Sequence, residues 1–433
     1  MNPRQLLARV TLGVSLFAPL CTAQTGFSTL YSFTGQNGDG GEPNGILAIG
    51  KNGVLYGTTA GGGSSPCSGG VLVPAGCGTV FELIPPAAPG GTWTESILYR
   101  FAGENGDGSS PYGGVVIGNG GRLFGTTLYG GAAGYGTVFE LTPPSAAGGR
   151  WTETVLHSFS DQNGDGIAPT GTLALDKNGQ LYGLTTFGGS SDNGTLYALT
   201  PPATAGEDWA ETILHSFTGS AFPPPQAYPA DNGVTIGADG SLYGATPMGG
   251  HGGSGMVFRF APPRSPGGSW TGTDLFDFPA SGVDGVEPSG GVVAGTDGAL
   301  YGGAAIGGRG DCTEGCGTVF QLTPPTTSTG AWNATVICDF GSPCGNPLGS
   351  FPQTNVVLGK NGTLFGTGLL VLFALQPPSE SGEAWTEFTI HNFDGAQPSG
   401  LAIGDDGVLF GTTMQGGPCN YCGTVFRWAP QGR

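Results

Sequence analysis

The stretch GVLYGTT at residues 53–59, which continues to residue 63 as AGGG, decides the fold because it is repeated along the chain. Six related stretches follow it: GRLFGTT at 121, GQLYGLTT at 179, GSLYGAT at 240, GALYGGA at 298, GTLFGTG at 362 and GVLFGTT at 407. A lone glycine-rich run after an apolar pair could bind phosphate, but no lysine follows any of these runs. Seven copies indicate a repeat architecture instead.

Each copy lies in a unit of about 60 residues that contains four short segments in a fixed order. In the first unit they are GILAIG at 45–50, LYGTT at 55–59, GTVFEL at 78–83 and WTESILYRF at 93–101. β-Branched and aromatic residues dominate the segments, and turn-forming residues separate them, so all four are predicted strands. Asn-Gly and Asp-Gly pairs suit the hairpin turns between the first two, and Pro-Pro ends the third.

Four antiparallel strands repeated seven times predict an all-β fold, a seven-bladed β-propeller. The small first segment suits the crowded centre of the ring, and the alternating fourth segment suits a half-exposed outer strand. The chain ends after the third segment of the last unit, and FSTLYSF at 27–33 matches the fourth. We therefore expect residues 27–33 to pair with the C-terminal blade and close the ring. A β-solenoid is the alternative, but four distinct strands per unit favour the propeller.

The N-terminus has the pattern of a secretory signal peptide. Arg4 and Arg9 precede an apolar run at 10–20, and the small residues Thr22 and Ala23 follow it. We expect cleavage after Ala23, with residues 24–433 forming a single propeller domain. A lipoprotein acylated at Cys21 is the weaker alternative, because bulky Leu20 precedes that cysteine. The mature protein is expected to be secreted, displayed on the cell surface or periplasmic.

The formal net charge of the chain is −18 at pH 7, with 31 acidic and 13 basic residues. This charge opposes binding to nucleic acid and to anionic membranes and favours cations or neutral ligands. No later run of about 18 apolar residues could span a membrane.

Eight cysteines remain after removal of Cys21, and they form four pairs that are close in the sequence. In an exported chain this spacing predicts local disulfides. The pairs are Cys67 with Cys77, Cys312 with Cys316, Cys338 with Cys344, and Cys419 with Cys422. The last pair could instead be a redox dithiol, but no helical context for one follows. No histidine lies near the pairs, which disfavours a zinc site built on them.

In a propeller the connections from strand two to three and from strand four to the next blade share one face. The cysteine pairs and glycine-rich runs fall in these loops, so this face is where function is expected. One such loop, DQNGDG at 161–166, resembles the start of a calcium loop, with Asp161, Asn163 and Asp165 as possible ligands. The alternative is ordinary Asn-Gly and Asp-Gly turn chemistry. Calcium is the one cofactor that the sequence suggests.

Three histidines, His157, His215 and His391, hold one position in the fourth segment, where other copies have Tyr, Phe or Cys. A position shared with Phe indicates packing rather than catalysis. His251 stands alone in a glycine-rich loop, and the tryptophan that opens the fourth segment is expected to be a packing anchor.

No catalytic motif is present, so we expect a non-enzymatic, monomeric propeller that binds an extracellular glycan or protein. The alternative is a polysaccharide hydrolase or lyase with acidic residues at the central channel. Its candidate residues are Asp39, Asp107, Asp165 and Asp284. A structural component of the cell envelope is a third hypothesis.

The unit LYGTT…GG…GTVF…W…LHSF resembles the GloVer-type tandem repeat of exported bacterial proteins with a choice of C-terminal anchor. The resemblance extends from about residue 27 to residue 428. It implies a secreted or surface-displayed bacterial protein, and it transfers no catalytic residue to this chain. The sorting tail expected for surface anchoring is not recognisable here.

Overall fold

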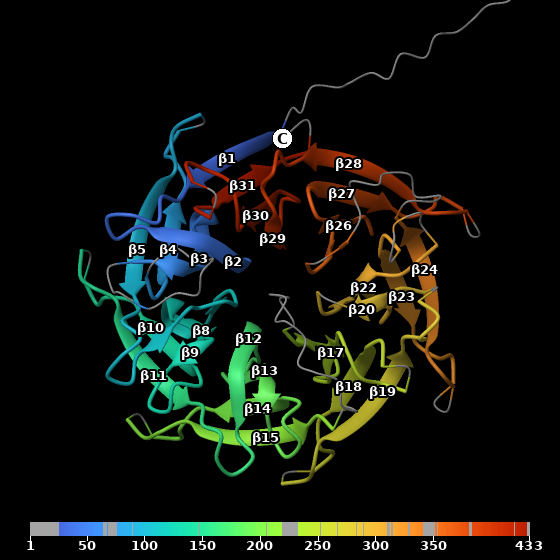
Figure 1. The fold of residues 1–433 in the computed structure, drawn as a ribbon, viewed down its shortest axis with the longest axis horizontal. Helices are drawn as coiled ribbons and strands as arrows, with labels where there is room; N and C mark the ends of the chain where they lie inside the picture. Colours follow the sequence, from blue (N-terminus) through green and yellow to red (C-terminus); the bar gives the residue numbers. More distant parts are fainter. Residues whose placement is uncertain are drawn as a thin grey trace, which may run out of the picture.

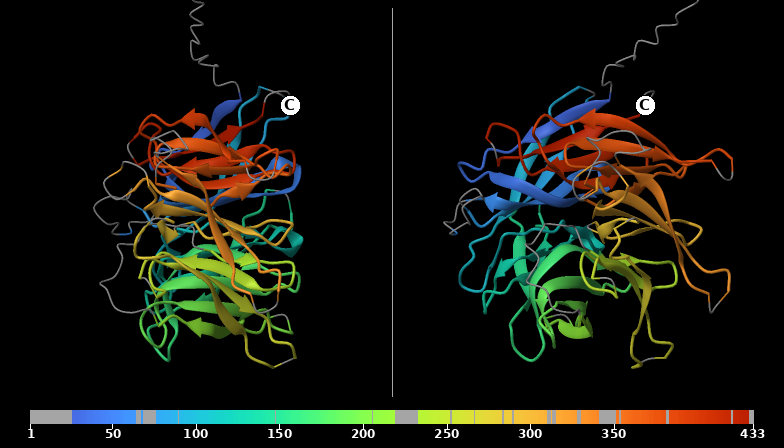
Figure 2. Two further views of the ribbon diagram at one scale, coloured as in Figure 1. Left: turned by 90° about the vertical axis from the view of Figure 1, so that its right-hand side faces the viewer. Right: turned by 45° about the vertical axis from the view of Figure 1, so that its right-hand side comes forward.

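A computed structural model shows a ring of seven four-stranded antiparallel sheets, the predicted seven-bladed β-propeller (Figure 1). It describes residues 26–430 except 64–66, 68–75, 89, 147, 205, 219–232, 252, 266, 283, 289, 310–311, 313–314, 328–329, 341–350, 353, 381–382 and 420. Over these residues the helical elements are two short 3₁₀ turns, η1 (Lys51–Gly53) and η2 (Asn119–Gly121). Seen from the side, the ring is a flattened disc whose strands run between its two faces (Figure 2).

The blades follow one another along the chain, each with its first strand innermost and its fourth outermost. Blade 1 contains β2 (Gly40–Ile49), β3 (Leu55–Gly62), β4 (Thr79–Ile84) and β5 (Thr94–Arg100); blade 2 contains β7 (Val116–Ile117), β8 (Leu123–Thr127), β10 (Thr137–Thr142) and β11 (Thr152–Ser158); blade 3 contains β12 (Gly166–Leu175), β13 (Leu181–Gly188), β14 (Thr195–Thr200) and β15 (Ala210–Ser216); blade 4 contains β16 (Thr235–Ile236), β17 (Leu242–Thr246), β18 (Met256–Ala261) and β19 (Thr271–Asp277). Blade 5 contains β20 (Val286–Pro288) and β21 (Val293–Ala294) on β22 (Leu300–Ile306), then β23 (Thr318–Thr323) and β24 (Asn333–Asp339); blade 6 contains β25 (Val357–Leu358), β26 (Leu364–Thr367), β27 (Val371–Gln376) and β28 (Thr386–Asn392); blade 7 contains β29 (Pro398–Ile403), β30 (Leu409–Thr413), β31 (Thr424–Trp428) and β1 (Phe27–Ser32). A small ribbon of β6 (Gly108–Ser109) and β9 (Tyr129–Gly130) extends blade 2.

The two ends of the chain close the ring, as the sequence predicts. β1 pairs antiparallel with β31, from Phe27 opposite Trp428 to Ser32 opposite Thr424. The N-terminal strand is therefore the outer strand of blade 7, and Phe33 directly after it is fully buried. This pairing covers the edge of β31, which would otherwise be an open sheet edge.

The core lies between the blades and contains one aromatic pair at every blade interface. The aromatic residue that ends the outer strand packs with the aromatic residue of the next blade's third strand, with ring centroids 5.0–5.5 Å apart. The seven pairs are Phe33–Phe81, Phe101–Phe139, Phe159–Tyr197, Phe217–Phe258, Phe278–Phe320, Phe340–Phe373 and Phe393–Phe426. Aromatic pairs of this kind add about 0.5–1.5 kcal/mol each beyond their burial.

The tryptophans form a second set of aromatic contacts between neighbouring blades. Trp151 packs on Tyr56 of the preceding blade, with ring centroids 6.4 Å apart, and Trp209 packs on Phe124 at 5.9 Å. Blade 7 has no tryptophan in its outer strand, and Trp428 of β31 contacts Phe365 of blade 6 instead. These residues are packing anchors, which accounts for their repetition.

The repeated LYGTT stretch is explained by contacts within and between blades. Gly57 lies against the ring of Phe81, where an added Cβ would approach the ring to 2.6 Å, so a larger residue does not fit. The hydroxyl of Thr58 donates to the carbonyl oxygen of Gly113 in the next blade at 2.8 Å. The stretch is thus a second blade strand whose glycine and threonine residues serve packing.

A second contact between blades joins the loop of one blade to the first strand of the next. Ala168 donates its backbone N–H to the carbonyl oxygen of Tyr135 at 2.9 Å. The adjacent Gly136, with a φ of +102°, lies directly against Pro169. We call this contact the glycine–proline latch; Gly78 and Pro111 repeat it between blades 1 and 2.

Candidate functional site

The face that carries the long loops is braced by disulfides. Cys67–Cys77, Cys312–Cys316 and Cys419–Cys422 are bonded in the connections between the second and third strands of blades 1, 5 and 7. Cys338 is also disulfide-bonded, and its predicted partner Cys344 lies outside the described residues. The prediction of local disulfides is therefore confirmed for three pairs.

Three connections between blades contain Asn-Gly-Asp-Gly, and their aspartates close the loop in one way. Each carboxylate accepts a hydrogen bond from the backbone N–H of the first residue after the buried phenylalanine. The bonds are Thr34 to Asp39 at 2.7 Å, Ala102 to Asp107 at 2.6 Å and Ser160 to Asp165 at 2.8 Å. Turn chemistry thus accounts for the motif, because the aspartate satisfies a backbone donor that the strand leaves unpaired.

Closing the loop brings each aspartate between the outer strands of two neighbouring blades. A Tyr or His comes from the preceding outer strand, and a Glu comes from the second residue of the following one. The three sets, named polar clusters here, are Tyr31–Asp39–Glu95, Tyr99–Asp107–Glu153 and His157–Asp165–Glu211. Each cluster lies at its own blade interface, and a whole blade separates it from the next. Three of the four aspartates named for the enzymatic alternative, Asp39, Asp107 and Asp165, therefore belong to three different blade interfaces.

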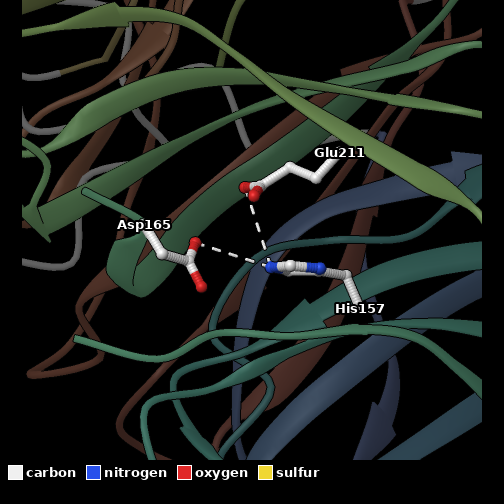
Figure 3. Close-up of side chains that lie close together, drawn as sticks. All are labelled: His157, Asp165 and Glu211. Carbon is white, nitrogen blue, oxygen red and sulfur yellow. Dashed lines mark ion pairs between the residues drawn. The ribbon is translucent and has the colours of Figure 1, made fainter. Parts of the chain in front are cut away.

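The third polar cluster is the one that contains a histidine, and its side chains converge (Figure 3). The Nε2 atom of His157 on β11 lies 3.5 Å from Oδ1 of Asp165 and 3.7 Å from Oε1 of Glu211 on β15. These separations are longer than ordinary hydrogen bonds. The side chains are 20%, 11% and 16% exposed, respectively, so water screens their charges only in part.

Burial and mutual charge shift the pKa values in this cluster. Burial raises the pKa of Glu211 to about 7, with the charge of Asp165 adding to the increase and that of His157 opposing it. Burial lowers the pKa of His157, but the attraction of Asp165 and Glu211 outweighs it and raises the pKa above its usual value. Burial also opposes ionisation of Asp165, yet His157 and two backbone N–H groups together lower its pKa. At neutral pH the cluster therefore holds protons that a cation could replace.

The other histidines have different surroundings. His391 stacks on Phe27 with centroids 3.5 Å apart, and His215 packs against Phe217 and Phe260. Burial lowers the pKa of both rings. These contacts are the packing role that the sequence predicts. His251 is exposed and pairs with Asp277 at 2.9 Å.

The residues proposed for calcium lie on the same loop with different orientations. Asp161 and Asn163 are exposed, and Asn163 has the positive φ of a turn residue. Asp161 accepts a hydrogen bond from Gln162, whereas Asp165 points to His157 and Glu211. A calcium ion held by Asp161, Asn163 and Asp165 stays a prediction.

Sequence reasoning did not identify Glu211 or the role of His157 beside it. The two residues belong to adjacent repeats and meet only because outer strands of neighbouring blades pack together. One signal was present: Glu occupies the third position of the fourth segment in three successive blades, at 95, 153 and 211.

The loop face also carries exposed apolar side chains next to the ends of the second strands. Tyr129, Met248 and Leu369 are 55%, 39% and 40% exposed, and they belong to blades 2, 4 and 6. Phe187 and Ile306 occupy the matching positions of blades 3 and 5 and are half-buried. We call Tyr129, Phe187, Met248, Ile306 and Leu369 the apolar rim.

Comparison with known proteins gives a family and a fold. Residues 16–237, slightly over half of the chain, match the model of a family described as the Gloeobacter/Verrucomicrobia repeat. No curated protein matches. Among the described residues no helix is long and apolar enough to cross a membrane.

Solved structures with a similar fold include two lyases. Virginiamycin B lyase from Staphylococcus aureus is 14% identical, with a TM-score of 0.53, and the match covers 93% of this chain and 99% of that one. An ulvan lyase solved with a bound sugar chain is 12% identical, with a TM-score of 0.49, and the match covers 92% and 94% of the two chains. At these identities the likeness concerns the fold alone.

Proposed function

This chain belongs to the Gloeobacter/Verrucomicrobia repeat family, and we propose that it is an exported, non-enzymatic propeller that binds a neutral glycan through its loop face. The apolar rim is the observation that carries this proposal. Large exposed apolar side chains recur there on blades 2, 4 and 6, within one residue of the same position of the repeat. Loops on a rigid scaffold are where binding residues usually lie, and an exposed tyrosine there offers an apolar ring face and a polar hydroxyl.

The net negative charge of the chain restricts the classes of ligand that it can bind. The chain has 31 acidic residues against 13 basic ones, so anionic polymers such as nucleic acids and polyuronates are repelled. A neutral sugar chain presents apolar ring faces for stacking on tyrosine and hydroxyl groups for the polar loops. A neutral glycan therefore matches both the apolar side chains and the negative charge of this surface.

Disulfides support the exported location, because they persist in oxidising compartments. Three are formed in connections on the loop face, between residues 10, 4 and 3 apart in the sequence. Export with cleavage after Ala23 is tested by N-terminal sequencing of the protein recovered from the producing cells. A retained residue 1 would reject it.

The binding proposal is tested on an array of neutral and acidic glycans with the chain that begins at residue 24. We expect retention of a neutral glycan, and about a two- to tenfold loss of affinity in Tyr129→Ala, since an aromatic contact contributes about 0.5–1.5 kcal/mol.

The matched control is Phe388→Ala, because Phe388 is 48% exposed but lies on the outer strand β28, away from the rim. Equal effects of the two substitutions, or no retention of any neutral glycan, would reject the proposal. Preferred binding of acidic glycans would reject the electrostatic part.

A further inference from the structure

We propose that His157, Asp165 and Glu211 bind one zinc ion that clamps blade 2 to blade 3. The site is separate from the apolar rim and independent of glycan binding. Its ligands come from β11, from the connection between the two blades and from β15 (Figure 3). A metal here would cross-link two outer strands that share no backbone hydrogen bonds.

The geometry is close to that of a tetrahedral zinc site. Zinc bonds to nitrogen and oxygen of about 2.0–2.1 Å place neighbouring ligand atoms roughly 3.3 Å apart. Nε2 of His157 lies 3.5 Å from the Asp165 oxygen and 3.7 Å from the Glu211 oxygen, and all three atoms lie within 4.8 Å of one another. Small side-chain rotations would bring them to binding distance, and water would take the fourth position.

Two atoms of the cluster lack hydrogen-bond partners, although they are buried. Nε2 of His157 and Oε1 of Glu211 have none in the described part of the chain. Buried polar atoms left in this state destabilise a fold. One cation between them would satisfy both atoms at once.

The other blade interfaces provide an internal comparison. Tyr99 replaces the histidine in the preceding cluster, and its hydroxyl donates to Asp107 at 3.2 Å. The tyrosine of that cluster therefore has a hydrogen-bond partner, whereas Oε1 of Glu153 is as unpartnered there as Oε1 of Glu211, so the difference between the two clusters is Nε2 of His157. His215 occupies the position of His157 one blade later, but Gly272 stands where the glutamate would be. Over the described residues, His157, Asp165 and Glu211 are the one group of three potential ligands this close together.

The ligand types select zinc over calcium. Calcium takes six to eight oxygen ligands, whereas an imidazole nitrogen with two carboxylates suits Zn²⁺ and, less tightly, Mn²⁺. When both carboxylates are ionised, their two negative charges exceed the single positive charge of an imidazolium. This excess of negative charge favours a divalent cation.

The experiment uses the chain from residue 24, stripped with a chelator and titrated with Zn²⁺ by calorimetry at pH 7.5. We expect one saturable site and an increase in Tm of several degrees at saturation. His157→Tyr should abolish both, and it should fold because the preceding interface already contains a tyrosine. His215→Tyr is the matched control and should bind zinc normally.

Cobalt provides a second readout, because its visible absorption reports direct coordination. We expect a cobalt spectrum that is lost in His157→Tyr and Glu211→Gln and kept in His215→Tyr. Unchanged zinc binding in His157→Tyr would overturn the proposal. The same conclusion follows if neither Zn²⁺ nor Mn²⁺ binds stoichiometrically at pH 7.5.

Discussion

Glu95, Glu153 and Glu211 are the second residues of the outer strands of three successive blades, and each faces an aspartate of the preceding connection. Burial raises the pKa of each glutamate to about 7. At pH 5 these groups are protonated and neutral in the folded protein. At pH 8 each interface must hold two carboxylates that are partly removed from water.

This shift predicts a fold that is more stable in mild acid than in mild base. The pKa of Glu153 is about 7 when folded and 4.5 as its ordinary value, so the folded state binds the proton more tightly. Its contribution to stability is complete below pH 4.5 and is lost as the pH rises through 7. Glu153→Gln keeps the neutral form at all pH values, and we expect it to raise Tm by about 2 °C at pH 8.

Thermal unfolding at pH 5, 6, 7 and 8 measures this effect. The variant should show a smaller fall in Tm from pH 5 to pH 8 than the parent protein. Glu104→Gln is the control, since Glu104 is exposed in the neighbouring loop and should leave the pH profile unchanged. A parent profile that rises towards pH 8 would contradict the prediction.

At the scale of the element, a blade is fixed to the next one by short-range contacts that repeat. Gly136 at the start of β10 fits against Pro169 of the next blade, and an added Cβ would lie 2.5 Å from the proline and from the carbonyl oxygen of Thr127. Gly134 has a similar backbone, with a φ of +86°, but nothing lies within 4 Å of the position of its Cβ.

Alanine substitutions at these two glycines therefore distinguish the effect of steric fit from the effect of backbone strain. Both alanine substitutions incur the cost of a positive φ, roughly 1 kcal/mol. Gly136→Ala additionally forces blades 2 and 3 apart, and we expect a total loss of about 3 kcal/mol in the free energy of unfolding. Urea denaturation of both variants checks the difference. Equal losses would show that the glycine–proline latch adds nothing to stability beyond the conformational preference of glycine for a positive φ.

Most elements could be predicted from the sequence, because a repeat supplies seven independent observations of each strand. The copies of LYGTT locate every second strand, and the tryptophan of the fourth segment locates six outer strands. The polar clusters could not be predicted in the same way. His157 and Glu211 are distant in sequence and meet through the stagger between neighbouring blades, which no property of a single repeat encodes.

On the scale of the whole molecule, the ring depends on one pair of strands from opposite ends of the chain. A chain that begins at residue 26 keeps β1, whereas one that begins at residue 34 loses β1 and the fully buried Phe33. One buried phenylalanine contributes about 3–5 kcal/mol to the free energy of unfolding, and we expect the shorter chain to lose more than this amount. The exposed edge of β31 should also promote association.

Chemical denaturation and size-exclusion chromatography compare the two chains. A synthetic peptide of residues 26–33 should partly restore the shorter chain and leave the longer one unaffected. If both chains unfold at the same urea concentration, the terminal strand pair is not a determinant of stability.

The pairing of β1 with β31 also sets an order of events during synthesis. β1 is synthesised before β31 and must wait for it, so no ring can form until translation of blade 7 is finished. A prematurely terminated chain keeps an unpaired N-terminal strand and an exposed sheet edge, both of which proteases and aggregation act on readily. Ring closure therefore requires that synthesis has continued through β31.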